Sequence, residues 1–206
     1  MKKSIFSFVC ALLFSVVLLC GCKSTTLQGK YAVSSLSCMG LTATKESFAA
    51  YSKSRTEIDQ NNNALFKPIY LLFNLNLSLN EDGSANLVIK DFKSTLKNDD
   101  HYSRALNSAI QKGYVKNNDL EISDLRWSID KSQSNTYFVF AIDQDGMKVS
   151  LSDIWGNSLF SCDYIHARIE NGKLACKIKV CVYEKETEEK SSVTLTTNVT
   201  IIMNKI

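Results

Sequence analysis

The sequence has little histidine and lacks the short motifs that mark common catalytic sites. Its 2 histidines are His101 and His166. No Gly-x-Ser-x-Gly, His-Glu-x-x-His or phosphate-binding glycine loop occurs. No Cys-x-x-Cys pair is present either, so a zinc site would need ligands from unrelated parts of the chain. The sequence therefore predicts a protein that is not an enzyme and that has no metal or cofactor.

An excess of either charge is also missing. The chain has 24 lysines and arginines against 21 aspartates and glutamates, and the basic residues are scattered. No basic stripe with interleaved aromatic residues is visible, so nucleic acid is not predicted as a partner. Internal repeats and low-complexity tracts are absent, and the length suits a single domain.

The N-terminal apolar run is too short to be read as a membrane-spanning helix. Lys2 and Lys3 precede an uncharged stretch from Ile5 to Leu19, whereas a spanning helix needs roughly 18 or more apolar residues. A short basic start followed by such a run is typical of a secretory signal.

The end of this run resembles the lipobox of bacterial lipoproteins. In that motif an aliphatic residue and two small residues precede an obligatory cysteine, and these places are occupied by Leu19, Cys20, Gly21 and Cys22. The resemblance implies that residues 1–21 are a signal peptide, that Cys22 becomes a lipid-carrying N-terminus, and that residues 22–28 form a tether. Several acyl chains give lasting attachment where one chain is marginal. The protein would then lie in the cell envelope, on the outer membrane or at the periplasmic face. If an ordinary signal peptide is cleaved here, Cys22 is instead a plain thiol.

Apolar and polar residues alternate along much of the chain after Gly29, as in half-buried strands. Between Phe73 and Ile89 the alternating residues flank Glu81-Asp82-Gly83. A three-residue loop with Gly83 in the left-handed conformation is the only register in which turn chemistry and apolar pattern agree. The predicted pairs are Leu79 with Ala85, Leu77 with Leu87, and Leu75 with Ile89.

A second hairpin turns at Asn171-Gly172, a strong short hairpin signal. Pairing Glu170 with Lys173 places further residues opposite each other: Ile169 and Leu174, Ala167 and Cys176, Ile165 and Ile178. The same count sets Cys162 opposite Cys181, near bridging distance, so this pair is a candidate disulfide. Two alternatives remain: a disulfide that involves Cys38, or no disulfide, with the cysteines present as free buried thiols.

Two helices interrupt the strands. Phe48, Tyr51 and Ile58 recur near helical spacing within residues 44–59, and a second helix is predicted between a cap at Asp99 or Asp100 and Gly113. The predicted fold is mostly β, an antiparallel meander of about eight strands with two inserted α-helices, over residues 29–206.

This strand count, together with Gly29-Lys30-Tyr31 on the first strand, resembles the lipocalin-like barrels of small bacterial lipoproteins. Lipocalins typically carry Gly-x-Trp at that place. A barrel of about eight strands is either filled with side chains or holds one small ligand. If it holds one, the residues expected to line the cavity are Tyr31, Phe73, Trp127, Phe138, Phe140 and Trp155.

Two functions therefore follow from the sequence. In the first, a membrane-anchored lipoprotein binds a small apolar or amphipathic ligand in its barrel. In the second, the barrel is filled, and the protein holds an envelope protein partner through an exposed sheet face or edge.

Overall fold

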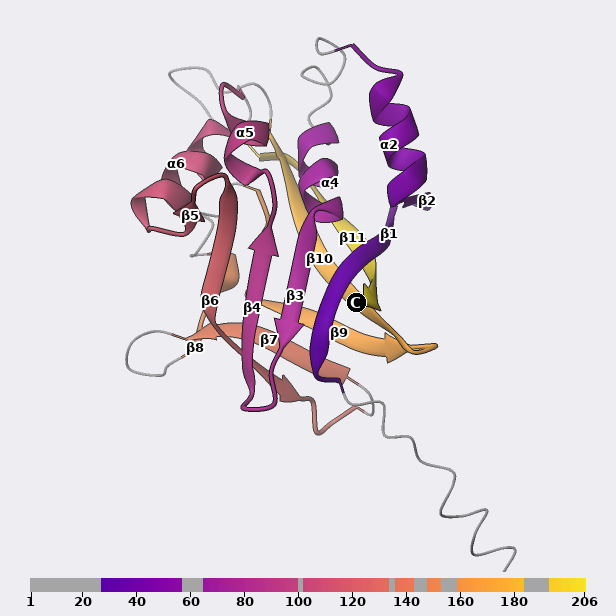
Figure 1. Ribbon diagram of the computed structural model, residues 1–206, viewed down its shortest axis with the longest axis vertical. Helices are drawn as coiled ribbons and strands as arrows, with labels where there is room; N and C mark the ends of the chain where they lie inside the picture. Colours follow the sequence, from indigo (N-terminus) through magenta and orange to yellow (C-terminus); the bar gives the residue numbers. More distant parts are fainter. Residues whose placement is uncertain are drawn as a thin grey trace, which may run out of the picture.

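The computed structural model describes residues 27–56, 65–99, 102–133, 136–142, 148–152, 159–183 and 193–206. Eight strands follow one another around a closed antiparallel barrel (Figure 1). In order they are β1 (Gly29–Cys38), β3 (Leu75–Leu79), β4 (Ser84–Ile89), β6 (Asp119–Ile129), β7 (Thr136–Ile142), β9 (Tyr164–Glu170), β10 (Lys173–Tyr183) and β11 (Val193–Lys205). Each strand pairs with the next, and β11 returns to β1, so the predicted mostly-β meander is confirmed.

Three short strands extend the sheet beside this path. They are β2 (Leu41–Thr44), which pairs with β1; β5 (Val115–Lys116), which pairs with β6; and β8 (Lys148–Val149), which pairs with β7. They add hydrogen bonds at the flanks of the barrel and do not take part in its closure.

Alternation along each strand sends one set of side chains inward. In β1 the buried residues are Tyr31, Val33 and Leu36, and the change of spacing after Val33 coincides with a bulge between Val33 and Ser35 in the pairing with β11. An extra residue in one strand reverses the faces of the residues beyond it. The bulge therefore keeps Leu36 in the interior.

Both predicted hairpin turns are confirmed. Gly83 has a φ of 79°, and Leu79, Leu77 and Leu75 pair with the predicted residues of β4. Asn171 and Gly172 have φ values of 50° and 74°, as a two-residue hairpin turn of the primed type requires. The predicted pairs Ile169 with Leu174 and Ala167 with Cys176 are present.

The second hairpin departs from the prediction beyond His166. Cys162 does not lie opposite Cys181, because β9 begins at Tyr164 and Phe160 forms the next bridge to β10, at Val180. The reason is a local one: the carbonyls of Cys162 and Asp163 accept hydrogen bonds from the amides of Ser152 and Leu151, which bends this segment away from β10. Ile165 likewise pairs with Val139 of β7 and not with Ile178.

Four helices occur among the described residues: α2 (Lys45–Lys53), α4 (Phe66–Phe73), α5 (Phe92–Leu96) and α6 (Ser103–Gln111). The first and last are the predicted ones. Thr44 caps α2 through a reciprocal pair of hydrogen bonds with Ser47. Before α6, the Asp99 carboxylate accepts a hydrogen bond from the Tyr102 amide, and Gly113 follows α6 with a φ of 75°.

The helices α4 and α5 were not predicted, and Phe73 belongs to α4, not to the strand that begins at Leu75. The α4 sequence is almost continuously apolar, and a short apolar run does not by itself separate helix from buried strand. Pro68 lies in the first turn of α4, where a proline is tolerated. The helix α5 is a single short segment whose Phe92 and Leu96, four residues apart, are both fully buried.

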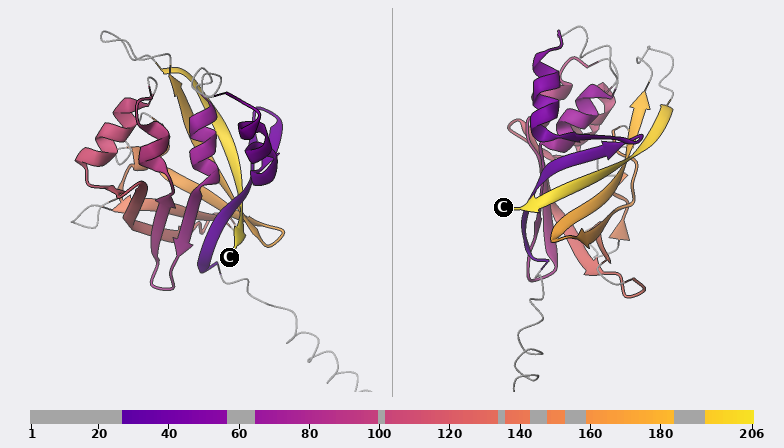
Figure 2. Two further views of the ribbon diagram at one scale, coloured as in Figure 1. Left: turned by 45° about the horizontal axis from the view of Figure 1, so that its top comes forward. Right: turned by 90° about the vertical axis from the view of Figure 1, so that its right-hand side faces the viewer.

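The helices gather at one end of the barrel, and β1 begins at the other end (Figures 1 and 2). Buried residues of α4, α5 and α6 belong to the same apolar core as the strand residues. Lys67 of α4 forms a salt bridge of 2.5 Å with Asp99, which precedes α6, and the Asp99 side chain is 3% exposed. This pair fastens α4 to α6. Among the described residues no helix is long and apolar enough to cross a bilayer.

Replacing Asp99 with alanine should destabilise the fold by about 3 kcal/mol, because removing one member of a buried pair leaves the other charge uncompensated. The change also takes away the acceptor of the Tyr102 amide. Urea unfolding followed by circular dichroism measures the effect. Lys90→Ala is the control, since its salt bridge with Asp119 is exposed, and it should leave the midpoint nearly unchanged. Equal midpoints for the two variants would contradict this role of Asp99.

Candidate functional site

The barrel interior, where the sequence predicts a ligand cavity, is filled with side chains in the described part of the chain. Inward residues of the strands are almost completely buried, among them Leu87, Ile122, Val139, Ile165 and Ile201. A side chain that lines an empty cavity keeps surface that a water-sized molecule can touch, and these keep almost none. Of the two arrangements open to an eight-stranded barrel, the described residues form the filled one.

The five described residues among the six predicted to line the cavity are divided between the core, its edge and the outer face of the barrel. Tyr31 and Phe73 are each 3% exposed and lie within the core. Trp127 is half-buried at the edge of the core, where its indole Nε1 donates a hydrogen bond of 2.8 Å to the Asn80 carbonyl. Trp155 lies outside the described residues.

Phe138 and Phe140 lie on the outer face of the barrel. The side chain of Val139 between them is fully buried in the core, and alternation places its two neighbours on the opposite side of β7. For these two residues the predicted position in the interior is wrong. On β7, Phe138 and Phe140 thus lie on the outer side, whereas Val139 and the half-buried Tyr137 lie on the inner side.

Gly29 and Tyr31 carry the lipocalin resemblance, and both have a local structural role at the start of β1. Gly29 has a φ of 146°, and a Cβ at this position would collide with the Lys205 side chain of β11. The Tyr31 hydroxyl donates a hydrogen bond of 2.5 Å to the Leu27 carbonyl, and burial raises the pKa of Tyr31. The hydrogen bond ties Leu27, just before β1, to the buried Tyr31.

A group of aromatic rings covers the outer face of β7 and β9. The pairing sets Phe138 opposite His166 and Phe140 opposite Tyr164. The Phe138 ring meets the Tyr164 ring edge-to-face at 5.0 Å and 88°, and its centroid is 5.4 Å from that of His166. Tyr164 remains 48% exposed. The rings therefore brace one another while leaving one of them open to solvent.

Basic side chains surround these rings. Lys148 places its Nζ 4.3 Å from the centroid of the Phe140 ring, a cation–π contact. Arg168 is exposed on the outer face of β9, and Lys177 and Lys179 are exposed on the outer face of β10. We call this surface the aromatic-basic face. Its members are Phe138, Phe140, Lys148, Tyr164, His166, Arg168, Lys177 and Lys179.

The aromatic-basic face is the basic surface with interleaved aromatics that the linear sequence does not reveal. Its residues come from four strands and alternate with inward ones, so no contiguous stretch is both basic and aromatic. The Asn171-Gly172 turn predicts that His166 lies beside Lys177, and this pairing is present. The pairing of β7 with β9 joins segments on either side of a long connection, and no turn signal fixes its register.

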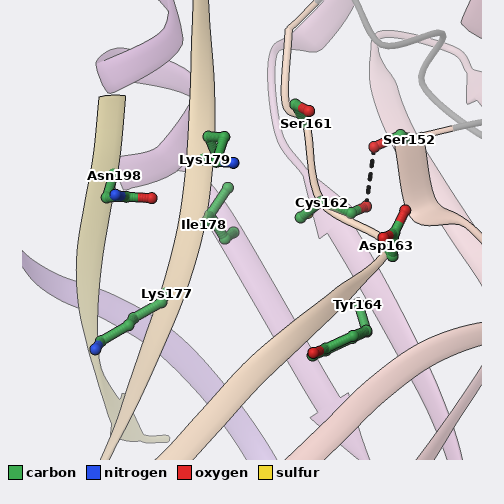
Figure 3. A pocket seen from close by; sticks show the side chains of 9 residues that line it. All are labelled: Ser152, Ser161, Cys162, Asp163, Tyr164, Lys177, Ile178, Lys179 and Asn198. Atoms are coloured by element: carbon green, nitrogen blue, oxygen red, sulfur yellow. Dashed lines mark hydrogen bonds between the residues drawn. The ribbon is translucent and has the colours of Figure 1, made fainter. Parts of the chain in front are cut away.

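A hollow of about 310 Å³ opens at the edge of this face (Figure 3). Lys179 of β10 and Asn198 of β11 lie on one side, on strands where these two residues are directly paired. Ser161, Cys162 and Tyr164 lie on the other side, along the segment that bends away from β10. The hollow thus occupies the place where the ladder between β9 and β10 is interrupted.

The hollow contains one thiol and one carboxylate among its described lining residues. Burial, and next the nearby Asp163 carboxylate, raise the pKa of Cys162 to about 12, so its thiol stays protonated at neutral pH. The Ser152 hydroxyl donates a hydrogen bond of 3.1 Å to the Cys162 carbonyl, and Asp163 accepts one of 2.7 Å from the Ser150 hydroxyl. No histidine is among the described residues that line the hollow.

No metal site is apparent either: the described histidines, cysteines and acidic residues form no group of three that could hold an ion. His101 lies outside the described residues.

The chain matches no known family model, no curated protein and no solved structure.

No disulfide joins Cys38, Cys162, Cys176 and Cys181 in the structure; all four are thiols. Burial alone raises the pKa of Cys176, which lies inside the barrel, to about 12. The pKa of Cys162 is also raised to about 12. Because thiolate is the reactive form, both thiols should resist alkylation while the protein is folded.

At pH 8, a pKa of about 12 leaves about one thiolate in ten thousand, whereas an unperturbed cysteine has roughly a quarter. Iodoacetamide should therefore leave Cys162 and Cys176 unlabelled in the native protein and label all four thiols after unfolding without reductant. Since the folded state holds these protons more tightly, stability should fall as the pH rises from about 9 towards 12. Peptide mass spectrometry measures the labelling, and a Cys162 to Cys181 bridge in the unfolded sample would contradict it.

Proposed function

We propose that this chain is a lipid-anchored protein of the bacterial cell envelope, with a lipocalin-like barrel that binds its partner on the outer surface. The observation that carries the proposal is the near-complete burial of the inward side chains in the described strands. An eight-stranded barrel without an internal cavity keeps only its faces, edges and ends for recognition. The absence of an activated nucleophile among the described residues of the hollow supports a binding function over an enzymatic one.

The lipid anchor is proposed from the lipobox-like residues Leu19 to Cys22, and the fold is compatible with it. Of the proposed tether, residues 22–28, Leu27 is already buried in the core, so residues 22–26 would span at most roughly 18 Å. The end of the barrel where β1 starts would then lie near the bilayer, and the helical end would face away from it (Figure 1). The aromatic-basic face, on the side of the barrel, would stay accessible.

A small apolar ligand inside the barrel, the other function considered from the sequence, has less support. It needs a cavity lined by apolar side chains, and sites for small molecules are concave and mostly apolar. The inward residues in the described strands contact one another instead. The outer hollow, in contrast, is lined mainly by polar and charged groups.

Expression of the full chain in a bacterium that processes lipoproteins tests the anchor. The mature protein should begin at Cys22, carry acyl chains and partition into detergent, because several chains give stable membrane binding. Cys22→Ala should abolish both the mass increase and the partitioning. Intact-mass and N-terminal peptide analysis provide the measurement.

Cys20→Ala is the matched control, since the motif requires only a small residue at that position, and it should leave lipidation intact. An unmodified Cys22 at the mature N-terminus would contradict the anchor. The native mass of the same preparation should be accounted for by chain and acyl groups. A stoichiometric apolar adduct would contradict the filled interior.

A further inference from the structure

We propose that the hollow beside Tyr164, together with the aromatic-basic face, binds an acidic sugar unit of a glycan. The inference deepens the proposed function by giving the chemical class of the partner bound outside the barrel. Three kinds of group meet at this place: an exposed aromatic ring, ammonium groups, and neutral polar groups on both sides of the hollow. An acidic sugar offers one counterpart for each of them.

The aromatic component is Tyr164. Its ring is 48% exposed and is held by the edge-to-face contact with Phe138 at 5.0 Å. A braced ring loses little conformational entropy when a ligand packs against it, and aromatic side chains supply large contact areas. The apolar C–H face of a pyranose ring is flat and packs well on such a surface. The outward position of this ring would otherwise leave an apolar group in contact with water.

The charged component is an excess of cations. Lys177 and Lys179 line the hollow, and Arg168 and Lys148 are exposed on the same outer face. Asp163 is the single carboxylate among the described lining residues, and it already accepts the hydrogen bond from Ser150. Charge complementarity therefore favours an anionic partner, whose carboxylate or phosphate would accept charge-assisted hydrogen bonds from the lysines.

The neutral component distinguishes a sugar from a simple anion. Ser161 and Asn198 line opposite sides of the hollow (Figure 3), and a hydroxyl and an amide each offer both a donor and an acceptor. Sugar hydroxyls need both kinds of partner. The volume of about 310 Å³ is at the small end of the range for ligand pockets, which suits one or two sugar rings.

A lipid surface fits this place less well. Anionic bilayers attract basic residues and aromatic rings, but they are flat on the scale of a protein face and leave a hollow unfilled. Water would stay in the hollow, so the polar groups on its walls, such as Ser161, would contribute no contact to the lipid. A chain of sugar rings can enter the hollow and continue over the rings of β7 and β9.

Isothermal titration calorimetry of the mature chain tests the proposal with three probes. The first is a trigalacturonate oligosaccharide, the second is a neutral galactose trisaccharide of the same length, and the third is a single-stranded thymidine oligonucleotide. Saturable binding of trigalacturonate at least ten-fold tighter than of the other two probes is the expected result. It should weaken as salt concentration rises, because the contacts are partly between charges.

Variants locate the site. Lys177→Gln and Lys179→Gln, each of which removes one ammonium, should weaken trigalacturonate binding several-fold, and the double variant at least ten-fold. Lys173→Gln is the matched control: Lys173 is exposed on the same strand, but it lies beside the hairpin turn and outside the hollow. Tyr164→Ala should weaken binding ten-fold, whereas Tyr164→Phe, which keeps the ring, should retain most of it.

Each other outcome overturns the inference. Absence of trigalacturonate binding, or equal binding of the oligonucleotide, would remove the acidic sugar as the partner. Binding that is as strong in the Lys177 and Lys179 variants as in Lys173→Gln would place the site elsewhere. These readouts do not depend on Cys22, so a failure here leaves the lipid anchor and the filled barrel to their own tests.

Discussion

Closure of the sheet, through β11 against β1 and β6 against β7, is the constraint on which the rest of the structure depends. An open sheet of this length would expose two strand edges with unpaired backbone groups, whereas a closed barrel has none along its circumference. Closure also gives every strand an inside and an outside. The bulge after Val33 lies in the seam between the first and last strands, and Gly29 at the start of β1 leaves space there for the Lys205 side chain of β11.

A closed barrel of this size can have a filled or a hollow interior, and the size of the inward side chains determines which of the two forms. Aliphatic residues of intermediate size, such as Leu87, Ile122 and Val139, fill the inside, and the helices α4 to α6 add their buried residues at one end. Phe138 and Phe140 of β7 are placed outward. They form a surface with exposed lysines where the polypeptide bends away from β10. The same alternation that fills the interior therefore builds the outer face on which recognition would occur.

The features that the sequence predicted correctly are those with a local cause. The turns at Gly83 and Asn171-Gly172 set their own registers, and the apolar spacing within residues 44–59 and the stretch before Gly113 indicated α2 and α6, although Tyr102 and not Asp99 is the N-cap residue of α6. The features that it missed depend on distant parts of the chain. Cys162 does not continue the β9–β10 pairing, because the amides of Leu151 and Ser152 donate hydrogen bonds to the carbonyls of Asp163 and Cys162. The aromatic-basic face forms only when β7 pairs with β9. The inward or outward side of Phe138 could not be decided before that pairing was known.

Enlarging an inward alanine tests the filled interior most directly. Ala167 lies on the core side of β9, between Tyr137 and Cys176, and is fully buried. In a filled barrel Ala167→Leu should lower the free energy of unfolding by about 1–3 kcal/mol, since extra methylenes force neighbours out of their rotamers. Thr196→Leu, on the exposed side of β11, should change it by less than about 0.5 kcal/mol. An unchanged or increased stability of Ala167→Leu, measured by denaturant unfolding, would mean that the barrel has room to spare and would contradict this account.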